Sequence, residues 1–275
     1  MKLGIIGDVH GSTSWTKAAI TRLATHGVKH LIQLGDFGIG LASRSFIPEV
    51  DAYLEHHGLE MTVVPGNHDD YHVVNEVAPG WLSEHIFLPY RGMTSSFDGK
   101  HVMYLGGAPS VDRTWRQRRM RNPHSQNIWW PEEALTAADE VYAIQAGTAE
   151  PVDFMFTHDA PYARAIDKQI AGNPLGFEYR DLEYAREGRD RMTRIVAAIR
   201  PKVLFHGHYH FKVRANLHWT DGSDGPWETG DIPKAAIAAT TRLIGLSNEG
   251  TRYNIAVLDT DTTEIKYIDA VGARS

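Results

Sequence analysis

Five short stretches rich in glycine, aspartate and histidine recur along the chain, and each follows an apolar run. They are "GDVHG" (7–11), "GDFG" (35–38), "GNHDDYH" (66–72), "THDAP" (157–161) and "GHYH" (207–210). The preceding runs, such as "KLGII" (2–6), have the length and composition of short β-strands. In open α/β sheets, ligands bind beyond the carboxyl ends of the strands. We therefore expect the five stretches to meet at one sheet edge, although they lie far apart in sequence.

The segments between these stretches alternate between strand and helix patterns. Strand patterns cover 2–6, 29–34, 60–64, 152–157 and 202–206, and helical patterns cover 12–27, 48–58, 131–147 and 189–200. The Asp98-Gly99 pair predicts a tight hairpin within 95–105, and further strand patterns lie near 211–217, 253–258 and 263–268. This mixture predicts an α/β fold with a sheet-rich core and helices outside it, compatible with a two-sheet sandwich.

The composition narrows the class of protein. The chain has 275 residues, of which 42% are hydrophobic and 23% charged, as in ordinary globular proteins. No apolar run approaches the roughly 20 residues that a membrane-spanning helix needs, so we expect no membrane partner. The N-terminal "MKLGIIGDVHG" lacks the long apolar region of a signal peptide. The chain has no cysteine, which excludes disulfides and thiolate ligands, and we expect a cytoplasmic protein.

The five stretches supply many side chains that can bind a metal ion. The candidates are Asp8, His10, Asp36, Asn67, His68, Asp69, His158, His208 and His210. Oxygen and imidazole ligands suit Mn, Fe, Zn, Ni or Co better than Ca or Cu(I). Asp8 and His10 are two residues apart, as are His208 and His210, so in extended chain each pair projects to one side. The set is too large for one tetrahedral ion and sufficient for two, with the carboxylate of Asp36 as the natural bridge. Each stretch alone would be an ordinary polar turn, but the ordered set of five favours a metal site.

In this order, the motifs Asp-x-His, Gly-Asp, Gly-Asn-His-Asp, a lone His and Gly-His-x-His resemble those of the calcineurin-like metallophosphoesterases, from residue 7 to residue 210. The resemblance implies a four-layer α/β/β/α sandwich with a dinuclear metal centre, and we expect residues 1–275 to form one domain. It assigns one ion to Asp8, His10, Asp36 and His210, and the other to Asp36, Asn67, His158 and His208. It also implies that His68 donates a proton near the substrate and that Asp69 orients His68.

The resemblance implies two divalent ions, for which we favour Mn, with Fe, Zn, Ni or Co as alternatives. Two dications against Asp8 and Asp36 leave about two positive charges, which lowers the pKa of a bridging water toward neutrality. Once that water is a hydroxide, the remaining charge of about +1 matches a singly charged phosphodiester. The implied mechanism is in-line attack by this hydroxide, with His68 protonating the leaving oxygen.

The sequence departs from the protein-phosphatase branch of that family, which has an arginine shortly after the second motif. Here Phe37 and Gly38 follow Asp36. The segment "GGAPSVDRTWRQRRMRNPHSQNIWWPEE" (106–133) is instead similar to a bacterial and phage subgroup. We expect a lid or insert at 106–131, in which Arg113 and Arg116 contact substrate phosphate and the tryptophans stack on a base. The alternative is a solvated arginine-rich loop whose tryptophans pack in the core. We also expect a long loop at 158–190 to cover the site, with 172–181 shaping a pocket.

The function that we predict is metal-dependent hydrolysis of a phosphodiester, most simply a nucleotide-like or cyclic one. Alternatives are a nuclease on RNA or DNA, a phosphomonoesterase, and a non-catalytic scaffold with the same fold. The scaffold is disfavoured because all candidate ligands and His68 are retained. The net charge of −6 argues against a generally basic nucleic-acid surface. The sequence predicts no particular oligomeric state.

Overall fold

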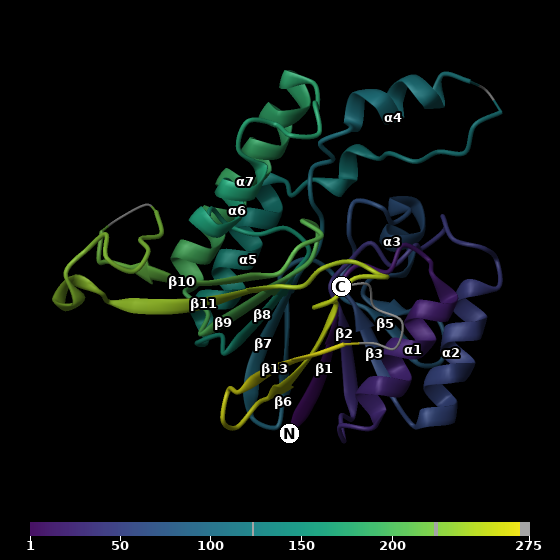
Figure 1. Cartoon of the computed structure of the whole chain (residues 1–275), viewed down its shortest axis with the longest axis horizontal. Helices are drawn as coiled ribbons and strands as arrows, with labels where there is room; N and C mark the ends of the chain where they lie inside the picture. Colours follow the sequence, from purple (N-terminus) through teal and green to yellow (C-terminus); the bar gives the residue numbers. More distant parts are fainter. Residues whose placement is uncertain (123, 223–224, 270–275) are drawn as a thin grey trace.

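Two β-sheets lie face to face between two layers of helices (Figure 1). The computed structural model describes residues 1–122, 124–222 and 225–269, so position 123 of the predicted insert and the end of the predicted domain, 270–275, lie outside the described residues. The strand order is β13-β12-β1-β2-β3-β5-β4 in one sheet and β10-β11-β9-β8-β7-β6 in the other. The predicted four-layer α/β/β/α sandwich is confirmed.

Each sheet has a parallel centre and antiparallel edges. The first consists of β1 (Lys2–Ile6), β2 (His30–Gln33), β3 (Glu60–Val63), β4 (Gly80–Trp81), β5 (Ile86–Leu88), β12 (Ile255–Asp259) and β13 (Ile265–Ile268). The second consists of β6 (Met93–Phe97), β7 (Lys100–Leu105), β8 (Phe154–Thr157), β9 (Val203–His206), β10 (Val213–Trp219) and β11 (Ala239–Gly245). Strands β1, β2, β3 and β5 are parallel, as are β7, β8, β9 and β11. All five predicted loops therefore leave the sheets at carboxyl ends of parallel strands.

The helices cover the outer faces of the sheets and the edge where the strands end. They are α1 (Thr13–Ala24), α2 (Phe46–His57), α3 (Tyr71–Val77), α4 (Arg113–Met120), α5 (Ala137–Ala149), α6 (Arg164–Ile170) and α7 (Tyr179–Ile199). Helices α1 and α2 share one buried apolar cluster with the first sheet. Helices α5 and α7 share another with the second sheet. Figure 1 shows α4 and the start of α7 over the strand ends, on the same side of the molecule.

Side chains alternate between the faces of each sheet. Leu3 and Ile5 of β1 belong to the core between the sheets, together with Phe154 and Phe156 of β8. Met155, between those two phenylalanines, packs on the outer helices instead. Because both faces are buried, the central strands read as continuous apolar runs, as parallel strands usually do.

The register of the first sheet explains why its loops converge. Ile6 of β1 lies opposite Gln33 of β2, and Gln33 lies opposite Val63 of β3. The three strands therefore end level with one another, and the polar residues that follow them emerge side by side.

Two predicted elements are wrong. The helix predicted over 131–147 begins at Ala137, because Thr136 and Asp139 form a capping box there; Pro131–Glu133 is a separate 3-10 turn. The predicted loop over 158–190 contains α6 and the first half of α7. In that half of α7 only Leu182 and Ala185 continue the apolar face of the second half, and the buried residues include Asp181 and Gly188, so the helical pattern is weak there.

Candidate metal centre

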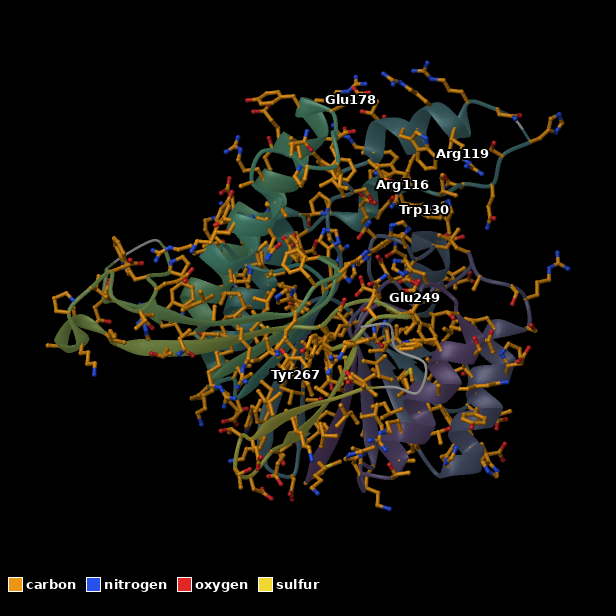
Figure 2. The ribbon with its side chains drawn as sticks, viewed as in Figure 1. Arg116, Arg119, Trp130, Glu178, Glu249 and Tyr267 are labelled. Carbon is orange, nitrogen blue, oxygen red and sulfur yellow. The ribbon has the colours of Figure 1, made fainter. Side chains whose placement is uncertain are left out.

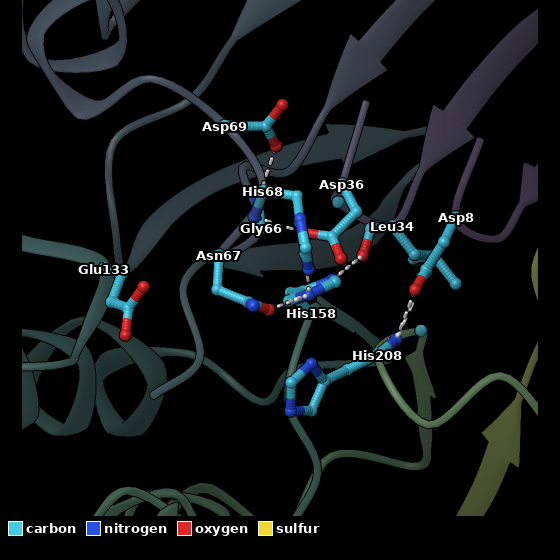
Figure 3. Close-up of polar contacts among 12 residues, drawn as sticks. Asp8, Leu34, Asp36, Gly66, Asn67, His68, Asp69, Glu133, His158 and His208 are labelled. Atoms are coloured by element: carbon cyan, nitrogen blue, oxygen red, sulfur yellow. Dashed lines mark hydrogen bonds and ion pairs between the residues drawn. The ribbon is translucent and has the colours of Figure 1, made fainter. Parts of the chain in front are cut away.

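The predicted ligands come together from both sheets at the strand ends (Figure 3). Asp8 and His10 follow β1, Asp36 follows β2, Asn67 and His68 follow β3, His158 follows β8, and His208 and His210 follow β9. The tertiary structure thus brings together side chains that the sequence separates by up to two hundred positions.

Asp36 lies at the centre of this cluster and is 1% exposed. Its Oδ2 lies 3.4 Å from Nε2 of His10, and its Oδ1 lies 3.3 Å from Nε2 of His158. The backbone N–H of His68 donates a hydrogen bond to Oδ1 at 2.7 Å. One buried carboxylate therefore faces an imidazole from each sheet, which is the arrangement that a bridging ligand requires.

One group of possible ligand atoms contains Asp8, His10, Asp36 and His210, all within 4.8 Å of one another. Oδ2 of Asp8 lies 3.2 Å from Nε2 of His210, and both oxygens of Asp8 accept from the backbone N–H of His208 at 3.1 Å. These contacts aim one carboxylate and two imidazole nitrogens at the space beside Asp36.

The other group contains Asn67, His158 and His208. Nδ1 of His158 lies 2.7 Å from the carbonyl oxygen of Leu34, which can only accept, so Nδ1 carries the proton. In the neutral ring that can bind a metal ion, Nε2 is the unprotonated nitrogen, and it points at Asp36 and at Oδ1 of Asn67, 3.0 Å away. The rings of His158 and His208 lie 5.0 Å apart. The group presents an amide oxygen and two imidazoles to the opposite side of Asp36.

A buried polar chain orients Asn67, and the sequence reasoning missed it. The Nδ2 group of Asn67 donates to Oγ of Ser110 at 3.1 Å, and Ser110 donates through both its N–H and its hydroxyl to Glu133 at 2.7 Å. Trp129 also donates to Glu133, at 3.0 Å. Burial raises the pKa of Glu133 to about 7, although the hydrogen bonds from Ser110 and Trp129 act to lower this pKa. Ser110 and Glu133 both lie in the segment 106–133 that the sequence singled out, so its polar residues were the available signal.

Four candidate ligands have a left-handed backbone, which side chains other than glycine rarely adopt. The φ angles are 43° at His10, 53° at Asp36, 66° at His208 and 58° at His210. Each such residue costs on the order of 1–3 kcal/mol, and such residues concentrate at functional sites. The surrounding packing must hold this conformation in place.

Two glycines beside the ligands are required by close packing. A Cβ at Gly35 would lie 2.2 Å from Nδ1 of His158, and a Cβ at Gly207 would lie 2.1 Å from Oδ1 of Asp8. Gly35 also has a φ of 101°. The recurrent glycine of the sequence motifs thus lets the strand ends approach the ligands, besides allowing a turn.

The electrostatics of the cluster favour a cation. Burial opposes protonation of His10, but hydrogen bonds to Asp36 and Glu249 outweigh it and raise the pKa of His10 to about 11. In His158 the charge of Asp36 likewise outweighs burial and raises the pKa to about 10. Positive charge is therefore stabilised here, and the donors are carboxylate, imidazole and amide groups. The residues fit a pair of divalent metal ions.

His68 and Asp69 lie beside this cluster. Asp69 is fully buried, and its two oxygens accept from four backbone N–H groups, those of Phe37, Gly38, Ile39 and Gly66, at 2.7–3.3 Å. These four bonds engage both oxygens with backbone groups, and the role of Asp69 in orienting His68 stays a prediction. Through these bonds Asp69 ties the loop after β2 to the loop after β3.

Comparison with known families decides what kind of site this is. Residues 1–212 match the family model described as calcineurin-like phosphoesterase. The chain belongs to this family. The resemblance in the sequence motifs is thereby confirmed, whereas membership of the bacterial and phage subgroup stays a prediction. As a calcineurin-like phosphoesterase, the chain is a metal-dependent phosphoester hydrolase.

Solved structures share the fold at low sequence identity. One aligns over 98% of this chain and 98% of its own, with 14% identity and a TM-score of 0.55. TT1561 of Thermus thermophilus aligns over 97% of this chain and 98% of its own, with 11% identity and a TM-score of 0.51. A dimetal phosphatase from Danio rerio aligns over 94% and 91%, with 15% identity and a TM-score of 0.48. A comparison with curated proteins finds no match.

In this phosphoesterase the two predicted substrate arginines have different surroundings. Arg116 is 2% exposed and lies beside His68, with an Nη2–Nε2 separation of 2.5 Å. Its Nε pairs with Asp112 at 2.7 Å, and its Nη1 donates to the carbonyl oxygen of Asn67 at 3.0 Å. Arg113 instead lies over the ring of Tyr184, 4.1 Å from its centroid, and 3.4 Å from Asp181. Arg116 is therefore part of the site, whereas Arg113 joins α4 to α7.

The three tryptophans of the segment 106–133 also have different surroundings. Trp130 is 2% exposed and belongs to the core of the first sheet, as the alternative interpretation expects. Trp129 is partly buried and bonded to Glu133. Trp115 is 54% exposed on α4, next to Arg119. Two of the three are thus held within the folded structure.

In the part of the chain that the structure covers, none of the helices is both long and apolar enough to cross a bilayer.

Proposed function

We propose that the chain hydrolyses phosphodiesters, of which a nucleotide-like or cyclic phosphodiester is the first candidate, with two Mn ions as cofactor and in the cytoplasm. The convergence of the two ligand groups on Asp36 carries this proposal. The preference for diesters is supported by the residues after Asp36. Phe37 is fully buried and Gly38 has no side chain, so neither residue directly after Asp36 offers a cation for the second charge of a monoester. The donors of Arg116 are already engaged by protein groups.

The proposed ligand sets share Asp36. One ion would be held by Asp8, His10, Asp36 and His210, and the other by Asp36, Asn67, His158 and His208. When bound, such ions act as Lewis acids on phosphoryl oxygens and lower the pKa of coordinated water. The chain contributes the orientation of these ligands, through Leu34 behind His158 and Ser110 behind Asn67.

We propose His68 as the proton donor to the leaving oxygen. Its backbone N–H is bonded to Asp36, so the residue has a defined position next to the ligands. Burial lowers its pKa, and the charge of Arg116 lowers it further against the opposing effect of Asp36. Because an arginine can only donate, Nε2 accepts from Arg116 in this arrangement. The neutral ring then carries its proton on Nδ1, so donation from Nε2 requires the ring first to take up a proton there from water and the leaving oxygen to replace the Arg116 N–H.

The first experiment compares matched diester and monoester substrates after metal stripping and Mn²⁺ reconstitution. Bis(p-nitrophenyl) phosphate and p-nitrophenyl phosphate share one chromogenic leaving group. We expect metal-dependent turnover with a higher kcat/KM for the diester. A preference for the monoester would contradict the diester proposal and support a phosphomonoesterase.

The second experiment tests His68 through the leaving group. His68→Ala should slow hydrolysis of an alkyl diester by roughly 10²–10⁴-fold, the usual contribution of a general acid. It should slow a p-nitrophenyl diester much less, because nitrophenolate leaves without protonation. Equal losses on both substrates would mean that His68 positions the substrate and does not protonate it.

A nuclease is the second candidate, favoured by the surface of α4. Trp115 is exposed there beside Arg119, and Arg118 is exposed as well. Arginine and aromatic side chains together bind single-stranded nucleic acid in many proteins. Binding of a short RNA or DNA should then weaken steeply with salt. The Arg118→Ala, Arg119→Ala double variant should flatten that dependence; an unchanged salt dependence would remove this candidate.

A further inference from the structure

A cavity of about 760 Å³ opens beside the candidate metal ligands and has two chemically different ends. Asp36, Asn67, His68, His208 and His210 line one end. Apolar side chains from three segments line the cavity as well: Pro109 and Val111 beside Ser110, and Ile170, Leu175, Phe177 and Leu182, which form its apolar end. A volume in this range is typical of sites that enclose a small molecule.

The rim of the apolar end is the connection 170–177 between α6 and α7. Leu175 is 77% exposed and Ile170 is 41% exposed, although both face the cavity. Gly172 and Gly176 in the same connection have φ angles of 75° and 68°, and a Cβ at either would have no neighbouring heavy atom within 4 Å. The rim thus presents uncovered apolar side chains on a connection with free space around it.

Most of the polar atoms of three side chains along the cavity wall, Asp159, Arg189 and Asn173, have partners. Asp159 accepts from the hydroxyl of Tyr209 and from the N–H of Ala160, both at 2.7 Å. Arg189 donates through Nη1 to Asp167 at 2.9 Å, whereas its buried Nε has no hydrogen-bond partner. The amide of Asn173 forms two bonds at 2.9 Å with the backbone of Phe177. Among the buried polar atoms of these three side chains only the Nε–H of Arg189 lacks a partner, so this end of the cavity offers mainly apolar contact and few donors or acceptors for the edges of a nucleobase.

We infer that the substrate carries one apolar ester group, aryl or alkyl, that occupies this end of the cavity while its phosphodiester lies at the candidate ligands. The inference rests on the proposed function and narrows its substrate class. The reason is that burying apolar surface against Leu175, Ile170 and Phe177 removes it from water, whereas the polar edges of a base would find few partners there.

The test uses diesters with one shared leaving group. Methyl, phenyl and thymidine-5′ p-nitrophenyl phosphates differ only in the retained ester group. We expect kcat/KM for the phenyl ester to exceed that for the methyl ester about tenfold or more, the discrimination that apolar pockets usually achieve. The thymidine ester should not exceed the phenyl ester.

Substitutions in the rim, residues 170–177, test whether it causes the preference for the phenyl ester. Leu175→Ser and Ile170→Ser alter exposed side chains, so the fold should survive, and the phenyl-to-methyl ratio should fall severalfold. The control is Val141→Ser on α5, an aliphatic residue 56% exposed and outside the cavity lining, which should leave the ratio unchanged. Calorimetry with phenylphosphonate and methylphosphonate on the Mn²⁺-loaded protein measures the same preference as binding.

The outcomes separate this inference from the proposed function. Turnover of diesters with equal rates for methyl and phenyl would overturn the inference and leave the proposed function intact. A thymidine ester preferred over the phenyl ester would overturn it in favour of a base-binding site. Absence of any metal-dependent turnover would contradict the proposed function; in that case equal affinities for the two phosphonates would overturn the inference as well.

Discussion

Glu249 contacts His10 from outside the candidate metal cluster, with its Oε2 2.8 Å from Nδ1 of the imidazole. Glu249 lies in the turn between β11 and β12, beyond the residues 1–212 that match the family model. In Figure 2, Glu249 lies over the same strand-end edge as Arg116 of α4. A carboxylate at Nδ1 keeps the proton there and leaves Nε2 toward Asp36 as the nitrogen that can bind a metal ion.

We expect Glu249→Ala to weaken metal binding. Partners that hold the second nitrogen of a ligating histidine are typically worth 10–100-fold in metal affinity, so a loss of about that size is expected. Glu249→Gln should lose less, because its amide oxygen can still accept from Nδ1. Calorimetric titration of the metal-stripped protein with Mn²⁺ gives the affinities. Glu264→Ala, an exposed carboxylate elsewhere, is the control; an unchanged Mn²⁺ affinity in Glu249→Ala would contradict the expectation.

Asp36→Asn should abolish binding of a metal pair. The amide has only one oxygen, so it cannot face both His10 and His158 with an acceptor. Metal content after Mn²⁺ loading and desalting, measured by mass spectrometry, should fall from about two ions per chain to one or none. Asp70→Asn is a matched control, because Asp70 caps α3 by accepting from His72 and asparagine caps helices equally well. Two tightly bound ions in Asp36→Asn would exclude the bridging assignment.

Glu133 should make stability depend on pH. Burial raises its pKa from 4.5 to about 7, so the folded protein binds a proton between these values that the unfolded chain has released. The contribution of protonated Glu133 to the free energy of unfolding is fully present below about pH 4.5 and is lost as the pH rises through about 7. Urea unfolding at pH 5, 6 and 7 should show the wild type losing roughly 1–3 kcal/mol relative to Glu133→Gln across this window. Parallel pH profiles for the two proteins would show that Glu133 ionises normally.

Arg116→Lys should lower kcat more than it raises KM. A lysine cannot pair with Asp112 and at the same time reach both Asn67 and His68, so the position of His68 is lost while the metal ligands stay. We expect a loss of about tenfold or more in kcat on an alkyl diester, as small displacements of a reacting group commonly cause. Arg113→Lys, which changes the contact with α7, is the comparison. Equal effects of the two substitutions would place Arg116 outside the chemistry.

Much of the site can be predicted from the local sequence. Asp8, Asp36 and His158 each follow a short apolar strand, and parallel strands bring their carboxyl ends to one edge whatever the details of packing. Short apolar runs and the glycines beside the ligands were therefore sufficient to predict the α/β class and the candidate ligands. These features were not sufficient for the charge-rich first half of α7. Its buried residues include Asp181 and Gly188, held by polar and close contacts, so few apolar residues mark the helix there.

The partners of the ligands depend on contacts between distant segments. Glu249 reaches His10 across 239 positions, and Glu133 reaches Ser110 across 23. The bonds of Asp69 could not be predicted from the sequence either, because its four backbone partners come from loops that meet only in the folded chain. Residue types and strand ends are local properties and can be read along the chain. Which carboxylate lies within 3 Å of which imidazole or amide follows from the packing of two sheets and their loops, which no local pattern encodes.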